Sequence, residues 1–230
     1  NTYIGWRAGY TATTAVQNVI VGGDAFKTGT GDHNAGLGKS VLLATTGDGN
    51  AALGSSALRN NTSGSNNVGI GLNAMYDNTT GAANVAIGAY ALRNNTTSSN
   101  TVAIGQSALD VATTASQNVA IGRDAMVSDT TGSDNVAVGY RALRTNTTGG
   151  SNACFGKDAG YYSTGDNNTY IGTASGPNAN SGATGSQNVA LGRSALRANT
   201  TASNNVAIGY QSMYNNTTGD RNIAVGSFAL

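Results

Sequence analysis

The chain has 230 residues, of which only 10% are charged, and it contains 33 glycines, one proline and one cysteine. Its net charge of +1 gives no electrostatic reason to expect nucleic acid or an anionic membrane as partner. No stretch approaches the roughly 20 apolar residues of a membrane span. Glutamate is absent, and the abundant Asn, Thr and Gly are weak helix formers, which disfavours an all-α fold.

A short apolar cluster that ends in glycine recurs along the whole chain, mostly every 16 or 17 residues and once after 20. Asparagine opens all but one of the copies, and we number the positions of each copy from it, so that glycine holds position five. The fourteen copies are 1–5, 18–22, 34–38, 50–54, 67–71, 84–88, 101–105, 118–122, 135–139, 152–156, 168–172, 188–192, 205–209 and 222–226. This regularity predicts an all-β fold, a parallel β-solenoid of about fourteen coils of 16–17 residues, in which stacking supplies the core.

Positions two to four of each copy predict a β-strand, because they are short and rich in β-branched residues. Positions two and four, such as Val85 and Ile87, point to the same side of a strand, and we expect them to close the core of the coil. Position three, such as Ala86, points the other way and is never charged. We therefore expect this column of small residues to pack against a second copy of the chain.

A second apolar patch follows each glycine at positions eight and nine, as in Ala57-Leu58. It predicts a shorter element whose Leu or Met fills the same core. The next segment often reads Asn-Thr-Thr, as at residues 78–80, and this composition is typical of a turn. Asparagines stacked in successive coils, about 4.8 Å apart, are expected to form amide ladders.

The organisation is that of one tandem-repeat domain over residues 1–230, which we interpret as a fragment of a longer fibre protein because the chain starts and ends inside a repeat. One coil is longer than the others, from Asn168 to Gln187, and contains Pro177. Insertions in solenoids form either a plain bulge or a loop on the binding side, and the sequence leaves both alternatives open.

The recurring Asn-Val-Ala-Ile-Gly cluster, as at residues 84–88, resembles the head repeats of trimeric autotransporter adhesins. The longer unit with its Asn-Thr-Thr-Gly turn is similar to the repeats of phage tail-fibre proteins. The resemblance covers the whole chain and implies a left-handed β-roll packed as a homotrimeric fibre. Two departures are the period of mostly 17 residues, longer than in the adhesin heads, and the lack of any neck, anchor or chaperone sequence.

The resemblance implies a structural and adhesive segment of a phage tail fibre that mediates host attachment by reaching or binding a cell-surface receptor. The partners would then be two further copies of the chain and a glycan or protein receptor, without membrane insertion. The expected location is the tail fibre of a virion, or else the extracellular cell surface. A bacterial adhesin head is the alternative within the same architecture.

Side chains able to carry catalysis are sparse, which indicates a protein that is not an enzyme and has no cofactor or metal site. His33 lies in a Gly/Asp turn, and Cys154 replaces alanine at position three, where we expect an inert packed thiol. Exposed aromatic residues with a polar edge suit contacts with sugars or proteins, and the alternative is that they brace neighbouring coils or chains. The candidate receptor contacts occupy positions six and ten and are Trp6, Tyr10, Tyr76, Tyr140, Tyr161, Tyr210 and Tyr214.

Two further interpretations stay open at the level of sequence. Paired threonines such as Thr130-Thr131 could form a flat array, as in an ice-binding β-solenoid, although other coils interrupt the array. About 17 residues per coil could also wrap three short sides of a monomeric β-helix. The mass of the chain in solution distinguishes the monomer from the trimer.

Overall fold

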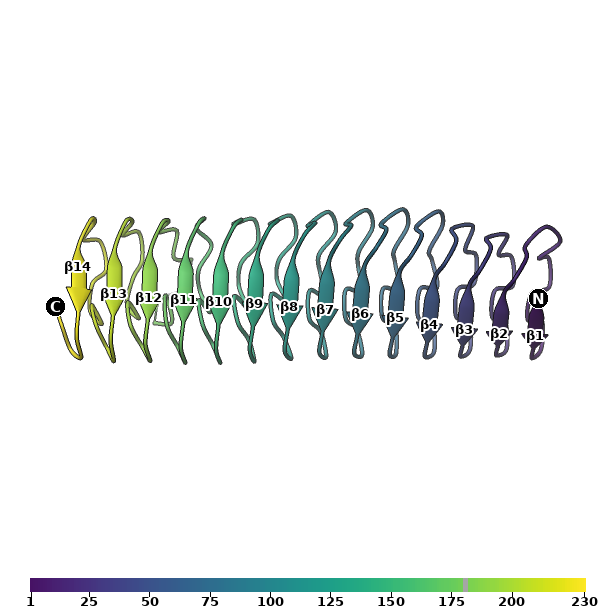
Figure 1. Cartoon of the computed structure of the whole chain (residues 1–230), viewed down its shortest axis with the longest axis horizontal. Coiled ribbons are helices and arrows are strands. Elements are labelled where there is room, and N and C mark those ends of the chain that lie inside the picture. Colours follow the sequence, from purple (N-terminus) through teal and green to yellow (C-terminus); the bar gives the residue numbers. More distant parts are fainter. Residues whose placement is uncertain (180–181) are drawn as a thin grey trace. The chain divides into compact units, whose positions relative to one another are not determined.

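The computed structural model describes residues 1–179 and 182–230. The chain divides into two compact units, residues 1–117 and 118–230, which are called unit 1 and unit 2 below. Each unit contains seven strands of three residues, and none of the described residues is helical (Figure 1). No helix that could cross a membrane is therefore found in this part of the chain.

The strands follow the fourteen copies of the repeat. Those of unit 1 are β1 (Thr2–Ile4), β2 (Val19–Val21), β3 (Ala35–Leu37), β4 (Ala51–Leu53), β5 (Val68–Ile70), β6 (Val85–Ile87) and β7 (Val102–Ile104). Those of unit 2 are β8 (Val119–Ile121), β9 (Val136–Val138), β10 (Ala153–Phe155), β11 (Thr169–Ile171), β12 (Val189–Leu191), β13 (Val206–Ile208) and β14 (Ile223–Val225). The prediction of one strand per copy is confirmed.

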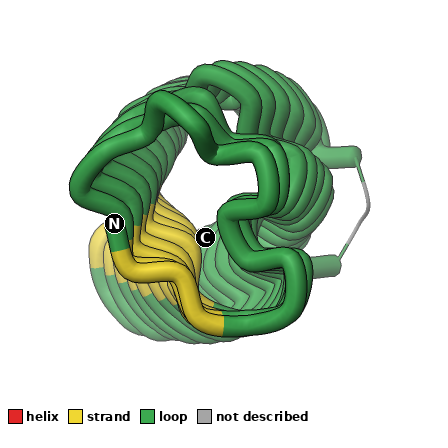
Figure 2. The backbone as a smooth tube through the Cα atoms, turned by 90° about the vertical axis from the view of Figure 1, so that its right-hand side faces the viewer, coloured by secondary structure: helices red, strands yellow, loops and turns green. Residues whose placement is uncertain are grey.

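Within each unit, consecutive strands pair in parallel and in register, so each unit is a β-solenoid (Figure 2). In unit 1, Val68 pairs with Val85 and Ile70 with Ile87. The long coil of unit 2 keeps this register, because β11 and β12 still pair position by position. Its additional residues are therefore accommodated outside the strand; residues 180 and 181 of that coil lie outside the described part of the chain.

Positions eight and nine form a turn rather than a second strand, although their side chains fill the core as predicted. Ala57 and Leu58 are fully buried. The N–H of Leu58 donates to the carbonyl of Ala74 in the next coil, and Leu58 adopts a left-handed backbone with φ 49°. The coil thus bends sharply at this point while its backbone remains hydrogen-bonded to its neighbour.

The orientation of the strand is the reverse of the sequence prediction, which placed positions two and four in the core and position three on the outside. The small side chains of position three, such as Ala86 and Ala103, are fully buried in the core of the coil. Positions two and four, such as Val19 and Leu37, point outward and are 55% and 51% exposed. The physical reason is space: in most coils Leu or Met at position nine already fills the narrow interior, which leaves room for only a small residue opposite it.

Residue volumes at positions three and nine compensate in several coils; the exception is the coil of Ile20 and Phe26, both fully buried, where Gly36 of the next coil leaves space for Ile20. Ala190 at position three accompanies Leu196 at position nine, and both are fully buried. The buried Tyr170 at position three accompanies Gly176 instead. A Cβ atom on Gly176 would lie 2.6 Å from Cγ of Tyr170, so the ring occupies the space that leucine takes elsewhere.

Two columns of buried asparagine connect successive coils, which confirms the predicted ladders. At position one, Asn67 donates from Nδ2 to the carbonyl of Gly81 at 2.9 Å, and its Oδ1 accepts the backbone N–H of Asn84 at 3.0 Å. In the turn column, Asn95 donates from Nδ2 to Oδ1 of Asn78 at 2.6 Å. These buried amides are satisfied by neighbouring coils, so they fix the stacking distance and the register.

The glycine of position five is required for two independent reasons. Gly88 has φ +135°, a conformation that side chains rarely adopt, and a Cβ on it would lie 2.6 Å from the backbone of Gly105 in the next coil. The glycine column therefore allows the close approach of successive coils immediately after each strand.

Candidate functional site

The most extensive candidate surface is the outer strand face, defined here as positions two and four of all the strands within a unit. In unit 1 these are Thr2, Ile4, Val19, Val21, Ala35, Leu37, Ala51, Leu53, Val68, Ile70, Val85, Ile87, Val102 and Ile104. In unit 2 they are Val119, Ile121, Val136, Val138, Ala153, Phe155, Thr169, Ile171, Val189, Leu191, Val206, Ile208, Ile223 and Val225. None of them is charged, and all are at least partly exposed.

In-register pairing turns these residues into two continuous apolar columns on each unit, since Val85 lies beside Val102 and Ile87 beside Ile104. A soluble β-sheet face in contact with water normally alternates with polar residues, and a large continuous apolar patch marks an interaction surface. The outer strand face therefore has the chemistry of a protein–protein interface.

A hollow of about 370 Å³ interrupts the outer strand face of unit 1. It lies where alanine replaces valine at position two, at Ala35 and Ala51, and its rim includes Val19, Leu37 and Leu53. Because its lining is almost entirely apolar, the hollow belongs to the same surface and has no polar group that would orient a ligand.

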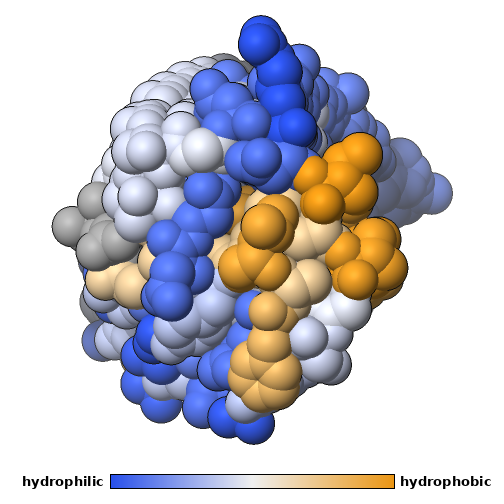
Figure 3. Space-filling view, turned by 90° about the vertical axis from the view of Figure 1, so that its left-hand side faces the viewer, coloured by the Kyte–Doolittle hydropathy of each residue, from blue (hydrophilic) through white to orange (hydrophobic). Residues whose placement is uncertain are grey.

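The last described coil of unit 2 also exposes apolar side chains, which gather on that end in Figure 3. The exposed ones are Ile223, Val225, Phe228 and Leu230. Ile223 and Val225 belong to the outer strand face, whereas Phe228 packs edge-to-face on Tyr210 with 5.2 Å between the ring centroids. Only Ile223 and Val225 of this coil therefore continue the apolar columns of the outer strand face.

Three of the predicted receptor contacts at position ten are held by an arginine at position ten of the preceding coil. The guanidinium of Arg144 donates to the hydroxyl of Tyr161 at 3.1 Å, and that of Arg197 donates to Tyr214 at 2.7 Å. Arg59 donates a hydrogen bond to the hydroxyl of Tyr76 in the same way. Bracing of neighbouring coils is therefore one role of these tyrosines.

The remaining predicted contacts are more exposed. Trp6 and Tyr10 are 67% and 70% exposed, and the guanidinium of Arg7 lies 3.6 Å from the centre of the Trp6 ring. Tyr140 and Tyr210 at position six are exposed as well. The seven residues do not form one cluster: they are distributed over coils of both units, and only in unit 2 are two of them linked through a shared arginine.

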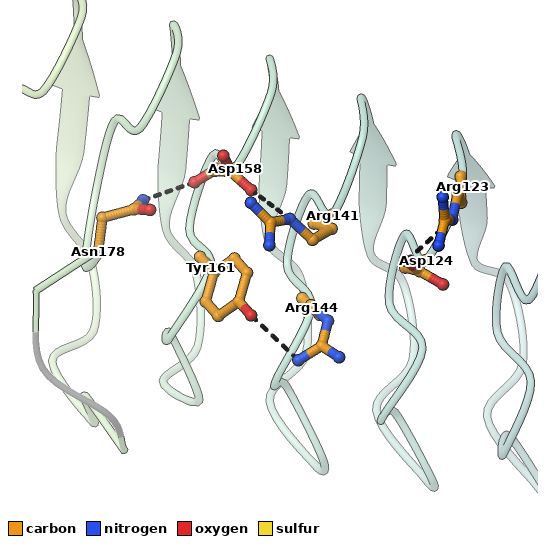
Figure 4. Close-up of polar contacts among 7 residues, drawn as sticks. All are labelled: Arg123, Asp124, Arg141, Arg144, Asp158, Tyr161 and Asn178. Carbon is orange, nitrogen blue, oxygen red and sulfur yellow. Dashed lines mark hydrogen bonds and ion pairs between the residues drawn. The ribbon is translucent and has the colours of Figure 1, made fainter.

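That link is Arg141, which lies between two of the predicted tyrosines. Its guanidinium carbon is 4.6 Å from the ring centre of Tyr140 and 5.1 Å from that of Tyr161. Its Nε is 2.8 Å from Oδ1 of Asp158, which raises the pKa of the arginine (Figure 4). Asn178 of the long coil donates to the backbone carbonyl of Asp158 at 2.5 Å.

These side chains surround a polar hollow of about 200 Å³ lined by Arg141, Asp158, Tyr161, Tyr162 and Asn178. Sequence reasoning identified Tyr161 alone among them. The available signal was positional: Arg141 and Asp158 both hold position seven, in successive coils, and the coil that follows contains the insertion.

Isolated reactive side chains are placed as the sequence predicted. His33 is exposed in a turn with φ 58°. Cys154 is fully buried, and burial raises the pKa of its thiol. Among residues 1–179 and 182–230 there is no group of three His, Cys, Asp or Glu side chains that could hold a metal ion.

Asp129 is a buried acid within the turn column of asparagines. Its carboxylate accepts the N–H of Gly132 at 2.8 Å and Nδ2 of Asn146 at 2.9 Å. Burial raises its pKa to about 7, and the two hydrogen bonds only partly oppose that effect. Sequence reasoning missed this buried acid, because the aspartate replaces an asparagine of almost identical shape.

Comparison with known proteins gives no relative: no family model matches the chain, and no curated protein or solved structure matches it significantly.

Proposed function

We propose that this chain is a structural and adhesive segment of a trimeric fibre of the phage tail-fibre type, which reaches or binds a receptor on a host surface. The observation that carries the proposal is the outer strand face, where no charged residue interrupts two columns of mostly Val, Ile and Leu in each unit. Three copies that pack these faces around a common axis would cover them.

The energetic argument follows from burial. Completing the burial of a partly exposed Val, Ile or Leu contributes roughly 0.5 to 1 kcal/mol, so the two columns of one unit supply on the order of 10 kcal/mol per chain. Association costs a comparable amount of translational and rotational freedom, but that cost is incurred once for a contact that spans many coils. A long array is therefore a stable way to join chains in parallel.

The proposal of three chains per fibre, and of a left-handed coil, comes from the resemblance of the repeats to those of fibre and adhesin proteins. Three receptor-binding copies at one tip raise avidity without stronger single contacts. The head of a bacterial trimeric adhesin shares this architecture. A neck and membrane anchor in the complete protein would favour the adhesin, and a tail-attachment or terminal chaperone domain would favour the phage fibre.

The proposal is tested by light scattering of the purified chain, whose mass is 22.9 kDa. We expect a mass near three chains. Ile87→Lys, on the outer strand face, should dissociate the assembly, because it places three charges against one another in an apolar contact. Thr97→Lys is the matched control, since Thr97 is exposed in the turn of the same coil. A wild-type monomer, or equal dissociation by both variants, would overturn the proposal.

A further inference from the structure

Charge is segregated on unit 2, although the chain as a whole is almost neutral. Positions six to eleven, which form the turn after each strand, contain six basic and two acidic residues, a net charge of +4. The basic residues are Arg123, Arg141, Arg144, Lys157, Arg193 and Arg197, and the acidic ones are Asp124 and Asp158. The turn before each strand contains Asp134, Asp166, Asp220 and Arg221, a net charge of −2.

Only part of this positive charge is neutralised locally. Arg141 pairs with Asp158 at 2.8 Å and Arg123 with Asp124 at 3.4 Å. Within the described residues, Arg144, Lys157, Arg193 and Arg197 form no ion pair with a carboxylate. They remain available to an anionic ligand.

Aromatic side chains are interleaved with these cations on the same turn. Tyr140, Tyr161, Tyr162, Tyr210 and Tyr214 all hold positions six, ten or eleven. Tyr161 and Tyr162 meet edge-to-face with 4.5 Å between their ring centroids, and the N–H of Tyr162 donates to the carbonyl of Pro177 in the long coil. Thr145 makes the corresponding backbone bond to Tyr161, so the regular hydrogen bonding between coils holds the pair of rings beside the polar hollow.

We propose that this turn of unit 2 binds an acidic polysaccharide, with the hollow lined by Arg141, Asp158, Tyr161, Tyr162 and Asn178 as its central subsite. The inference rests on the proposed function and names the chemical class of the surface receptor. Aromatic rings stack on the apolar faces of sugars, and Asn178 with the tyrosine hydroxyls can exchange hydrogen bonds with sugar hydroxyls. Arg144 and Lys157 attract the acidic substituents.

Two features favour a polysaccharide over nucleic acid. The carboxylate of Asp158 lines the hollow, where it would repel a phosphate but accept a hydrogen bond from a sugar hydroxyl. The cations of this turn that form no ion pair among the described residues are also sparse, four over seven coils, whereas duplex DNA presents one charge for about every 1.7 Å of its axis. An acidic sugar chain, which presents hydroxyls and apolar ring faces between its carboxylates, matches this mixture of cations, tyrosines and Asn178 better than a continuous phosphate backbone does.

The test measures binding of the whole chain to polygalacturonate by titration calorimetry, beside uncharged dextran and a single-stranded DNA oligonucleotide. We expect binding to polygalacturonate that weakens with salt and is absent for dextran. Arg144→Gln combined with Arg197→Gln should weaken binding at least tenfold, and Lys157→Gln severalfold. Arg221→Gln is the matched control for Lys157→Gln, because it also removes one positive charge but from the opposite turn, and it should leave affinity unchanged.

Absence of binding to polygalacturonate, equal weakening by Arg221→Gln, or tighter binding of the DNA would each overturn the inference. Circular dichroism of each variant establishes that it is folded. Light scattering of the same samples separates this inference from the proposed function: a trimer that does not bind refutes only the polysaccharide, and a monomer that binds refutes only the trimer.

Discussion

Replacing Asp129 by asparagine is expected to stabilise unit 2 at neutral and alkaline pH. The carboxyl is buried in a column that elsewhere contains asparagine, and burial raises its pKa to about 7 from an ordinary value of 3.8. The folded chain therefore holds the proton of Asp129 more tightly than the unfolded chain does. Its contribution to stability is fully present below pH 3.8, is lost as pH rises through 7, and is constant above that.

The size of the effect follows from the two pKa values. They differ by about 3, and each pKa unit corresponds to about 1.4 kcal/mol, so the wild type loses up to about 4 kcal/mol between acid and alkaline pH because of this group. An asparagine has no charge to bury and can accept the N–H of Gly132, as Asn146 accepts that of Gly149. Asp129→Asn should therefore remove this part of the pH dependence.

The assay is urea unfolding followed by circular dichroism at a fixed protein concentration, from pH 4 to pH 9. The gain in stability of Asp129→Asn over wild type should be largest above pH 7 and should decline toward pH 4. Asp134→Asn is the matched control, because Asp134 is exposed in the same unit and asparagine holds the same place in other coils, as at Asn204. A gain independent of pH, or the same gain for both variants, would refute the reasoning.

Two further predictions concern the core of unit 2. Gly176→Leu should destabilise the chain by about 3 kcal/mol or more, because the leucine side chain collides with the ring of Tyr170. Tyr170→Ala should cost about 4 kcal/mol through the cavity it leaves. The double variant should recover at least half of the summed loss in urea unfolding, and purely additive losses would contradict the volume pairing. Cys154 should react with a maleimide only after unfolding, since its thiol is buried and its pKa is raised; labelling of the native chain as fast as in urea would show that the coil is open.

Much of the fold could be predicted from the sequence because the same pattern of residue types recurs in fourteen copies of the repeat. The strands, the buried Leu or Met of position nine and the asparagine ladders all followed from positions that recur with the same chemistry. The orientation of the strand did not follow, since an apolar column inside a core and one on a covered surface have the same composition. The combinations of Tyr170 with Gly176 and of Ala190 with Leu196 indicate which face of the strand points into the core. Only side chains that face each other in the core must compensate in volume.

The candidate surfaces were less predictable for a related reason. The net charge of the whole chain, +1, conceals the opposite charges of the two turns of unit 2. Exposed aromatic residues could be identified from their positions, but their arginine partners belong to the preceding coil and are about 17 residues away in sequence. Arg144 and Tyr161 become neighbours only once the register of the coils is known.

The asparagine and glycine columns have a consequence for how such a chain can change over generations. Every coil but the one that begins at Thr101 presents an asparagine amide at position one to the next coil, and every coil has glycine at position five, as Asn67 does for Asn84 and Gly88 for Gly105. A coil thus makes the same kind of contact with the coil before it as with the coil after it. Recombination between repeats in the gene can therefore add or delete a whole coil while the remaining coils keep their asparagine hydrogen bonds to one another. The number of coils can then change while the chemistry of each coil is kept.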